Sequence, residues 1–256
     1  MTQHGFGPLP AYAIGAVLAV ACVGAVAAGS DPSRGIFPGA RLDADGAVVL
    51  TQEKILRIPG TSKERTVLAE GTRLSKQESI KVRAQGKLYE VEMWGGDDIG
   101  VLAVFPAGAT EATDVADVQS NSTPYLSTTL ISLGGDDAFT VDDSHHNSGE
   151  SFNQTSLFHL RNGRLRWIAV IGTQAEVGGC GKSYRDDLRW KVEPSGDVLP
   201  IIVADVETTH SPKDFPENCK RHDVKEWHEH VYRKFRWDAA KDRYGEELRK
   251  PEPGKR

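Results

Sequence analysis

The stretch TSLFHLRNGRLRWIAVIG, residues 155–172, decides the fold of this chain. Asn162 and Gly163 stand between two runs in which apolar and polar side chains alternate. Both positions accept a positive φ, so the pair favours a two-residue type I′ turn, and such a turn fixes the register of the strands it joins. The predicted register opposes Arg161 to Arg164, Leu160 to Leu165, His159 to Arg166, Phe158 to Trp167, and Leu157 to Ile168.

Alternation also assigns the side chains of this hairpin to two faces. One face is apolar and is expected to hold Phe158, Leu160, Leu165, Trp167 and Ala169. The other face is polar near the turn, at His159, Arg161, Arg164 and Arg166, and apolar further along, at Leu157, Ile168 and Val170. The tip is therefore expected to project into water, while the base is buried on both sides.

A second hairpin is predicted at residues 78–94, with Gln85-Gly86 as its turn. Val82 would oppose Tyr89 and Ile80 would oppose Val91 on an apolar face. Lys81 and Glu90 would pair on the wet face. Residues 101–105, which are continuously apolar and end at Pro106, indicate a buried strand.

Further strands are predicted at residues 126–133, 138–141, 188–192 and 198–206. The longest alternating run, 225–237, would place Trp227, Val231, Phe235 and Trp237 on one face. No long helical pattern occurs. The sequence thus predicts a mainly β, antiparallel fold with little helix, built from about ten to thirteen short strands. It would form one sandwich-like or barrel-like domain, or two β lobes.

The composition suggests the following division of the chain. Residues 1–27 are a signal peptide or N-terminal anchor, 28–38 a tether, and 39–106 an N-terminal β lobe. Residues 107–124 are a connecting segment rich in small and acidic residues, in which Val115 and Val118 could equally form a short edge strand. Residues 125–248 are a C-terminal β lobe and 249–256 a charged, disordered tail.

The N-terminal segment 11–28 is uncharged and rich in Ala, Val and Gly. Ala25-Val26-Ala27 fits the small-residue pattern of a signal-peptidase site. Two facts count against a standard signal peptide: no Lys or Arg precedes the segment, and Arg34 and Arg41 follow it. A retained anchor is therefore the alternative to a cleaved signal. We expect a periplasmic or secreted protein, with membrane anchoring by residues 11–28 as the alternative. A lipid-modified Cys22 is a weaker option.

Two further cysteines, Cys180 and Cys219, lie beyond this segment. In an exported protein they predict one disulfide bond. It would close a loop of about 40 residues and stabilise the fold by roughly 4 kcal/mol in the chain-entropy treatment. Two unpaired thiols are the rival interpretation.

The net charge of the 256-residue chain is −5, which argues against general affinity for nucleic acid. Possible partners are an envelope protein, a glycan or an anionic polymer. The five tryptophans could line a glycan platform, but tryptophans at alternating strand positions favour a core role.

The densest polar stretch is 142–154, and its composition predicts a loop before the central hairpin. Its candidate ligand-binding residues are Asp142, Asp143, Ser144, His145, His146 and Asn147. A serine hydrolase would need a nucleophile, a histidine base and an acid, and this stretch contains all three residue types. No G-x-S-x-G motif is present. A hydrated loop whose polar side chains bond their own backbone explains the same composition.

His228 and His230 form the second candidate site. On a strand the two imidazoles point the same way and could share a zinc ion, but a metal site needs further ligands. No H-E-x-x-H motif supplies them. Alternatively, the two histidines become charged below pH 6 and join Lys234 and Arg236 in a cationic strip.

The sequence contains no motif specific to one reaction. We therefore expect a non-catalytic, exported binding or envelope-associated protein, with no cofactor and no assigned catalytic residue. The alternative is a periplasmic or secreted hydrolase or metalloenzyme that uses the 142–154 segment.

Overall fold

The Asn162-Gly163 hairpin is present in the computed structural model of the chain. It joins β11 (Glu150–Arg161) to β12 (Arg164–Gly178), and the φ angles of Asn162 and Gly163 are 53° and 70°. The predicted pairs are confirmed as far as Phe158 and Trp167. The next pair is wrong, because Leu157 opposes Ala169 across a β-bulge. Ile168 is the extra residue, and with Ala169 it packs into one core, so Ala169 does not share the face of Trp167.

The structure describes residues 35–59, 65–96, 99–118, 124–147, 150–178, 183–195, 199–210 and 227–248. They lie in the compact unit Pro32–Arg256. Every regular element among them is a strand, so the predicted mainly β fold is confirmed. The expected number and length of strands are wrong: two eight-stranded sheets are present, and β12 alone has 15 residues.

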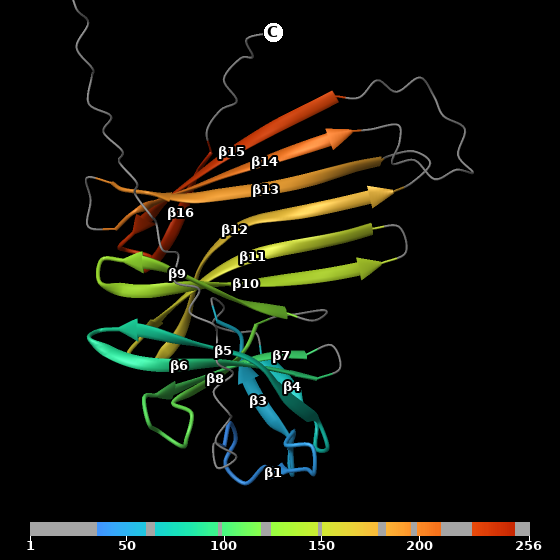
Figure 1. Ribbon diagram of the computed structural model, residues 1–256, viewed down its shortest axis with the longest axis vertical. Coiled ribbons are helices and arrows are strands. Elements are labelled where there is room, and N and C mark those ends of the chain that lie inside the picture. Colours follow the sequence, from blue (N-terminus) through green and yellow to red (C-terminus); the bar gives the residue numbers. More distant parts are fainter. Residues whose placement is uncertain are drawn as a thin grey trace, which may run out of the picture. The chain divides into compact units, whose positions relative to one another are not determined.

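The first sheet has the strand order β1-β2-β5-β6-β7-β8-β3-β4 (Figure 1). Its strands are β1 (Arg41–Leu42), β2 (Val48–Val49), β3 (Lys54–Arg57), β4 (Arg65–Leu68), β5 (Arg73–Ala84), β6 (Lys87–Gly96), β7 (Ile99–Pro106) and β8 (Asp114–Asp117). β8 contains Val115 but is not an edge strand, because it lies between β7 and β3.

The second sheet is a meander in which every strand pairs with its neighbour in sequence, from β9 to β16. The remaining strands are β9 (Pro124–Leu133), β10 (Asp136–Asn147), β13 (Ser183–Glu193), β14 (Ile201–His210), β15 (Trp227–Asp238) and β16 (Arg243–Leu248). The long alternating run near the C-terminus is therefore a strand, as predicted.

The second predicted hairpin, formed by β5 and β6, is also confirmed. Gln85 and Gly86 have φ angles of 51° and 72° at the turn. Val82 opposes Tyr89, and Lys81 opposes Glu90. β7 follows as a strand whose apolar residues from Val101 to Phe105 are fully buried. These local features follow from the turn residues and from the length of the apolar run.

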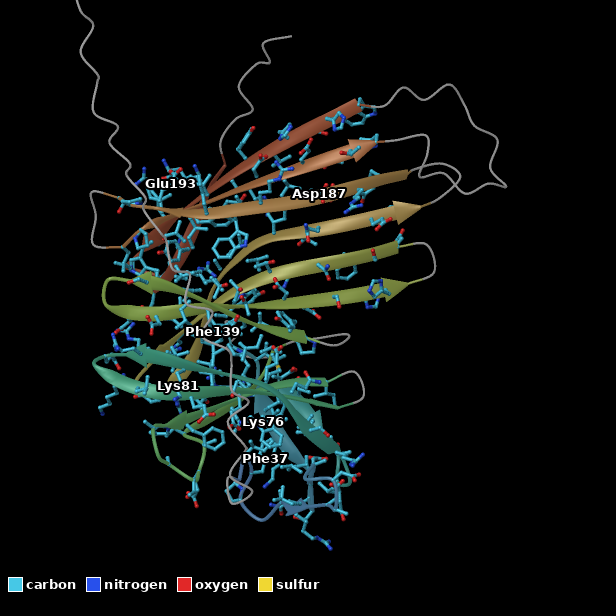
Figure 2. All side chains as sticks on the ribbon, in the orientation of Figure 1. Phe37, Lys76, Lys81, Phe139, Asp187 and Glu193 are labelled. Carbon is cyan, nitrogen blue, oxygen red and sulfur yellow. The ribbon has the colours of Figure 1, made fainter. Side chains whose placement is uncertain are left out.

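Three apolar clusters hold the sheets. One joins the two sheets and includes Val82, Met93, Phe139, Phe158 and Leu165. A second lies on the other side of the first sheet, and the third lies within the second sheet. Figure 2 labels Phe139 in the first cluster and Phe37 in the second. The joining cluster buries Phe158, Leu160 and Leu165 near the turn of the central hairpin, while the third cluster buries Leu157 and Ile168 at its base.

Side chains of the first sheet also bind the backbone of the second at the hairpin turns. Gln85 Oε1 accepts a hydrogen bond from the Asn162 amide at 2.9 Å. Thr113 Oγ1 donates to the Gly163 carbonyl at 3.1 Å. These bonds fix the tip of the central hairpin against the first sheet, so the tip does not simply project into water.

A charged pair makes a further contact beside this turn. Asp114 Oδ2 accepts a hydrogen bond from the Leu165 amide at 2.8 Å, and Arg57 donates to the Leu165 carbonyl at 2.9 Å. Arg57 and Asp114 also bind each other. The backbone of β12 at Leu165 is therefore satisfied by side chains from the first sheet.

The interpretation of 142–154 as a loop is wrong. Residues 142–147 complete β10 and residues 150–154 begin β11, with Asp142 opposite Thr155 and Asn147 opposite Glu150. A polar composition does not prevent pairing where the neighbouring strand supplies a ladder of backbone hydrogen bonds. The candidate residues therefore stand on paired strands.

Candidate functional site

The strands of the second sheet continue well beyond its buried core. The part that we call the bare sheet consists of residues 142–146 of β10, 150–154 of β11, 173–177 of β12, 184–189 of β13, 207–210 of β14 and 227–232 of β15. Not one of these residues is buried. Figure 2 labels Asp187 in this region. Both faces of a six-stranded sheet are therefore left open by the described residues.

Backbone register shows which side chains share a face of the bare sheet. One continuous row crosses all six strands and contains His146, Ser151, Glu176, Arg185, Thr209 and His228. Register partners point to the same side of a sheet. The face that holds this row is called the polar face. It includes members of both sequence-predicted sites, from β10 and from β15.

The two predicted sites nevertheless stay far apart. His146 and His228 are separated by five strand-to-strand steps of about 4.8 Å, which places their strands roughly 24 Å apart. Side chains at this separation cannot act on one substrate atom. The structure thus brings the two groups to one face but not into one site.

The candidate residues of β10 are divided between the two faces of the strand. Asp142 and Ser144 line a small polar hollow of about 280 Å³ with Tyr125, Asn153 and Gln174. Asp142 Oδ1 accepts a hydrogen bond from Thr155 Oγ1 at 2.5 Å.

Strand alternation places His145, the neighbour of Ser144, on the opposite face. There its ring centroid lies 5.0 Å from that of Phe152. Among the described residues, Ser144 forms no hydrogen bond with His145 or His146. The parts of a serine triad are therefore present in the sequence but are not assembled here.

His228 and His230 do lie side by side, and they face carboxylates of β14. His228 Nδ1 is 3.4 Å from Glu207 Oε1 and 3.1 Å from Thr209 Oγ1. His230 Nδ1 is 3.2 Å from Asp205 Oδ1. Across the residues that the structure describes, no group of three or more His, Cys, Asp and Glu side chains could hold a metal ion.

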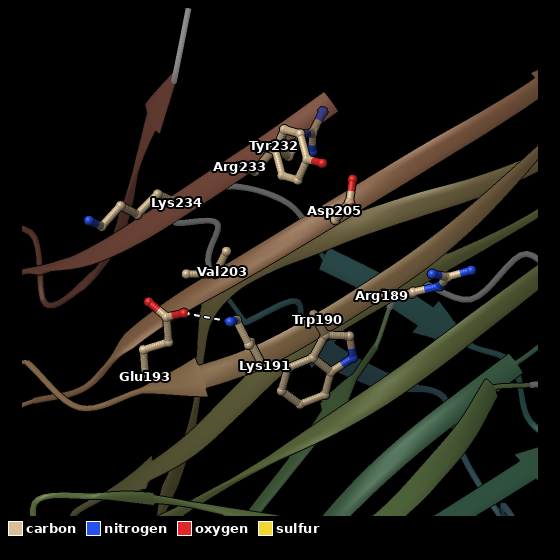
Figure 3. A pocket seen from close by; sticks show the side chains of 9 residues that line it. All are labelled: Arg189, Trp190, Lys191, Glu193, Val203, Asp205, Tyr232, Arg233 and Lys234. Carbon is tan, nitrogen blue, oxygen red and sulfur yellow. Dashed lines mark ion pairs between the residues drawn. The ribbon is translucent and has the colours of Figure 1, made fainter. Parts of the chain in front are cut away.

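Lys234 continues the same strand face into a shallow hollow of about 490 Å³ (Figure 3). Lys191 pairs with Glu193 at 2.7 Å in this hollow, and Trp190 also lines it. Asp205 also lines it. The expected cationic strip is thus interleaved with acidic side chains, which reduce its positive charge.

The opposite face of the bare sheet, which we call the aromatic face, is more apolar. His210 stacks on Trp227 with their ring centroids 3.6 Å apart, and Tyr184 lies 5.7 Å from His210 on the other side. Phe152 is 39% exposed and Trp227 is 45% exposed. Val231, which is 42% exposed, pairs with Val206 at the margin of the third core cluster.

The aromatic face was missed by sequence reasoning. Its members come from β11, β13, β14 and β15, and only the register of four strands aligns them. The exposed position of Trp227 at the start of a strand is the one local signal. The expectation of core tryptophans fits Trp94, Trp167, Trp190 and Trp237, which belong to or pack against the core clusters.

Several predictions lie outside the described residues. These are the export segment 1–27, most of the 28–38 tether, the tail 249–256, and all three cysteines, including Cys180 and Cys219. No helix in the described part of the chain is long and apolar enough to cross a membrane.

Comparison with models of protein families, with curated proteins and with solved structures finds no match for this chain.

Proposed function

We propose that this chain is an exported, non-catalytic binding protein that docks a partner protein on the aromatic face of the bare sheet. The observation that carries the proposal is the continuation of six paired strands beyond the core, with neither face covered by the residues that the structure describes. A β-sheet gains stability when at least one face is buried. A partner laid on the aromatic face would provide that burial.

The aromatic residues of the bare sheet support a protein partner. Tyr, Trp, Phe, His and Arg are all represented, whereas its residues include no lysine. Aromatic residues and Arg are enriched in protein interfaces, whereas Lys, Glu and Asp are depleted. The bare sheet lacks Lys but keeps acidic residues such as Glu176 and Asp187, so its aromatic residues, rather than its whole composition, support a contact surface. Lysine is also a residue that commonly protects exposed β-structure from unwanted pairing, and that protection is missing here.

Binding is preferred to catalysis because the reactive side chains are dispersed. A hydrolase requires a nucleophile, a base and an acid within hydrogen-bonding distance of one another. Ser144 on β10 and His228 on β15 stand on strands five places apart in the sheet order. Tyr184, His210 and Trp227, by contrast, are already in ring contact across three neighbouring strands.

Site-specific photocrosslinking in cells that produce the full chain tests this proposal. A benzophenone amino acid at Phe152 or Trp227 is expected to give one discrete, heavier adduct that contains a partner protein. Ile55 is the control position, because it is 65% exposed but lies on β3 of the first sheet. The same adduct at Ile55, or no adduct at any position, would contradict the proposal.

Other results of the same experiment assign the surface differently. Adducts that contain two copies of this chain would make the aromatic face a self-association surface. Glycan-containing adducts that are absent after glycosidase treatment would indicate a carbohydrate ligand. Either result would replace the partner-protein interpretation.

Export remains part of the proposal and rests on residues 11–28. We expect mature protein in a periplasmic or culture fraction without detergent. Retention in the membrane fraction would support the anchor instead. The pairing of Cys180 with Cys219 is expected to leave no reactive thiol in the mature protein before reduction and two after it. Thiol labelling without reductant distinguishes these states.

A further inference from the structure

The divergence of β12 from β13 points to a second binding site. Among the described residues, β12 pairs with β13 only at residues 176–178, so the outer edge of its first half has no hydrogen-bonded strand partner, although β16 lies close to it. Figure 1 shows β12 curving away from β13. β16 is the last described strand of the sheet, and β15 is its one strand partner there.

These two strands line one groove. A hollow of about 870 Å³ is bordered by residues 166–170 of β12 on one side and by residues 241–246, in and before β16, on the other. Ala169 and Val170 are half-buried and contribute apolar surface, beside the buried Ile168 and Tyr244 of the third core cluster. The groove therefore combines an apolar floor with walls of strand backbone.

The backbone of Trp167 is available in this groove. In a two-residue hairpin, hydrogen-bonded and non-hydrogen-bonded pairs alternate from the turn, so the N–H and C=O of Leu165 and Trp167 both point away from β11. Those of Leu165 are taken by Asp114 and Arg57. Among the described residues, the backbone groups of Trp167 have no such partner.

The charge of the groove selects the kind of ligand. Three of its charged side chains are neutralised within the fold: Asp242 pairs with Arg161, Glu246 with Arg233, and Lys241 with Asp238. Arg166 and Arg243 are exposed, and neither has an ion-pair partner within the described residues. The net charge that remains for a ligand is positive.

We propose that the groove between β12 and β16 binds an extended acidic peptide segment of a partner protein. The peptide lies along the edge of β12 and bonds the backbone of Trp167, which is the mode known as β-augmentation. Its carboxylates meet Arg166 and Arg243, and its apolar side chains face Ala169 and Val170. This site is separate from the aromatic face, so either can fail without the other.

Fluorescence anisotropy on the full mature chain tests this inference. The probe is a short labelled peptide of alternating Glu and Val, and the comparison peptides have Lys in place of Glu or N-methyl groups on alternate amides. The acidic peptide is expected to bind at least about tenfold more tightly than either comparison peptide, and its affinity should fall as salt rises. Equal binding of all three peptides would overturn the inference.

Charge reversal then locates the site. Arg166→Glu and Arg243→Glu are each expected to weaken binding of the acidic peptide about tenfold and to favour the Lys peptide. Arg164→Glu is the matched control, because Arg164 is exposed on the same strand but does not line the groove. Unchanged thermal unfolding confirms that each variant is folded.

The controls also separate other occupants. A similar loss of binding in all three Arg variants would mean that the peptide is attracted by the overall charge of the surface. That result would contradict a specific site in the groove. Sedimentation at rising protein concentration tests whether the chain associates with itself through the groove. Self-association that Arg243→Glu abolishes would assign the groove to a second copy of this chain, and the peptide proposal would fall.

Discussion

Leu188 on β13 occupies the space directly in front of Gly172 on β12. A Cβ atom at position 172 would lie 2.7 Å from Leu188 Cδ1. Gly172 thus lets a side chain of one strand cover the backbone of the next, at the point where the two strands separate. β12 and β13 are paired at residues 176–178 of β12, and beyond this pairing Leu188 packs between the two strands against the third core cluster.

The change Gly172→Ala is expected to destabilise the fold by about 1–3 kcal/mol, because the new methyl group overlaps Leu188. Chemical denaturation measures the free energy of unfolding. The double variant with Leu188→Ala should lose less than the sum of the two single variants, since the smaller side chain removes the overlap. Additive losses would show that the two positions are independent.

Asp114→Ala is expected to lower the free energy of unfolding by about 2 kcal/mol, because it leaves the Leu165 amide and the Arg57 guanidinium without their shared acceptor. Asp45→Ala provides the control: its carboxylate pairs with Arg73 but is 79% exposed, so its loss should change stability by less than about 0.5 kcal/mol. Equal effects in the two variants would argue against the inter-sheet contact.

Because the His159 imidazole is largely buried, we expect the free energy of unfolding to fall in mild acid. Burial lowers the pKa of its imidazole, which lies beside Trp237 with a ring-centroid distance of 6.0 Å. The unfolded chain therefore takes up the proton first, and stability falls as the pH decreases from the unfolded value of about 6.5 through the folded pKa.

His159→Phe should flatten this acid dependence, which unfolding curves recorded between about pH 7 and pH 5 would measure. The contribution of His159 protonation disappears above that window. An unchanged slope in the variant would mean that other groups produce the acid sensitivity.

Because the Tyr244 phenol is buried, we expect the free energy of unfolding to fall as the pH rises into the alkaline range. Burial raises the pKa of its phenol to about 12, and its hydroxyl donates to the Pro200 carbonyl at 3.0 Å. The unfolded phenol ionises first, so this residue favours unfolding as the pH rises from about 10 towards 12.

At neutral pH, Tyr244→Phe should be less stable than the parent chain by about 1 kcal/mol, because one hydrogen bond is lost. The difference should shrink above about pH 10, since the variant has no phenol to ionise at this position. Unfolding curves at both pH values measure it. A constant difference would contradict the raised pKa.

Local turn chemistry was predictable from the sequence, and longer pairing was not. Asn162-Gly163 and Gln85-Gly86 determine their hairpins through residues that accept a positive φ. The register beyond Phe158 depends on a bulge that the buried packing of Ile168 stabilises, and alternation alone does not reveal it. The central position of β8 depends on a parallel contact between Arg57 and Ala116, far apart in the sequence.

The candidate site shows the same limit. Polarity made residues 142–154 resemble a loop, although their pairing extends an adjoining ladder. The alignment of Tyr184, His210 and Trp227 requires knowledge of which strands are neighbours. Side-chain type identified the chemistry that was available, but the sheet order decided which groups could meet.

The bare sheet has a consequence for how ligand binding can be observed. All of its strands except β13 run without interruption into a segment that contains buried residues, so their backbone amides are expected to form a gradient from open to protected. Deuterium uptake should accordingly be fast at the outer ends and slow near the core. A ligand that covers the outer ends would slow uptake there first, and the resulting pattern would map its footprint strand by strand.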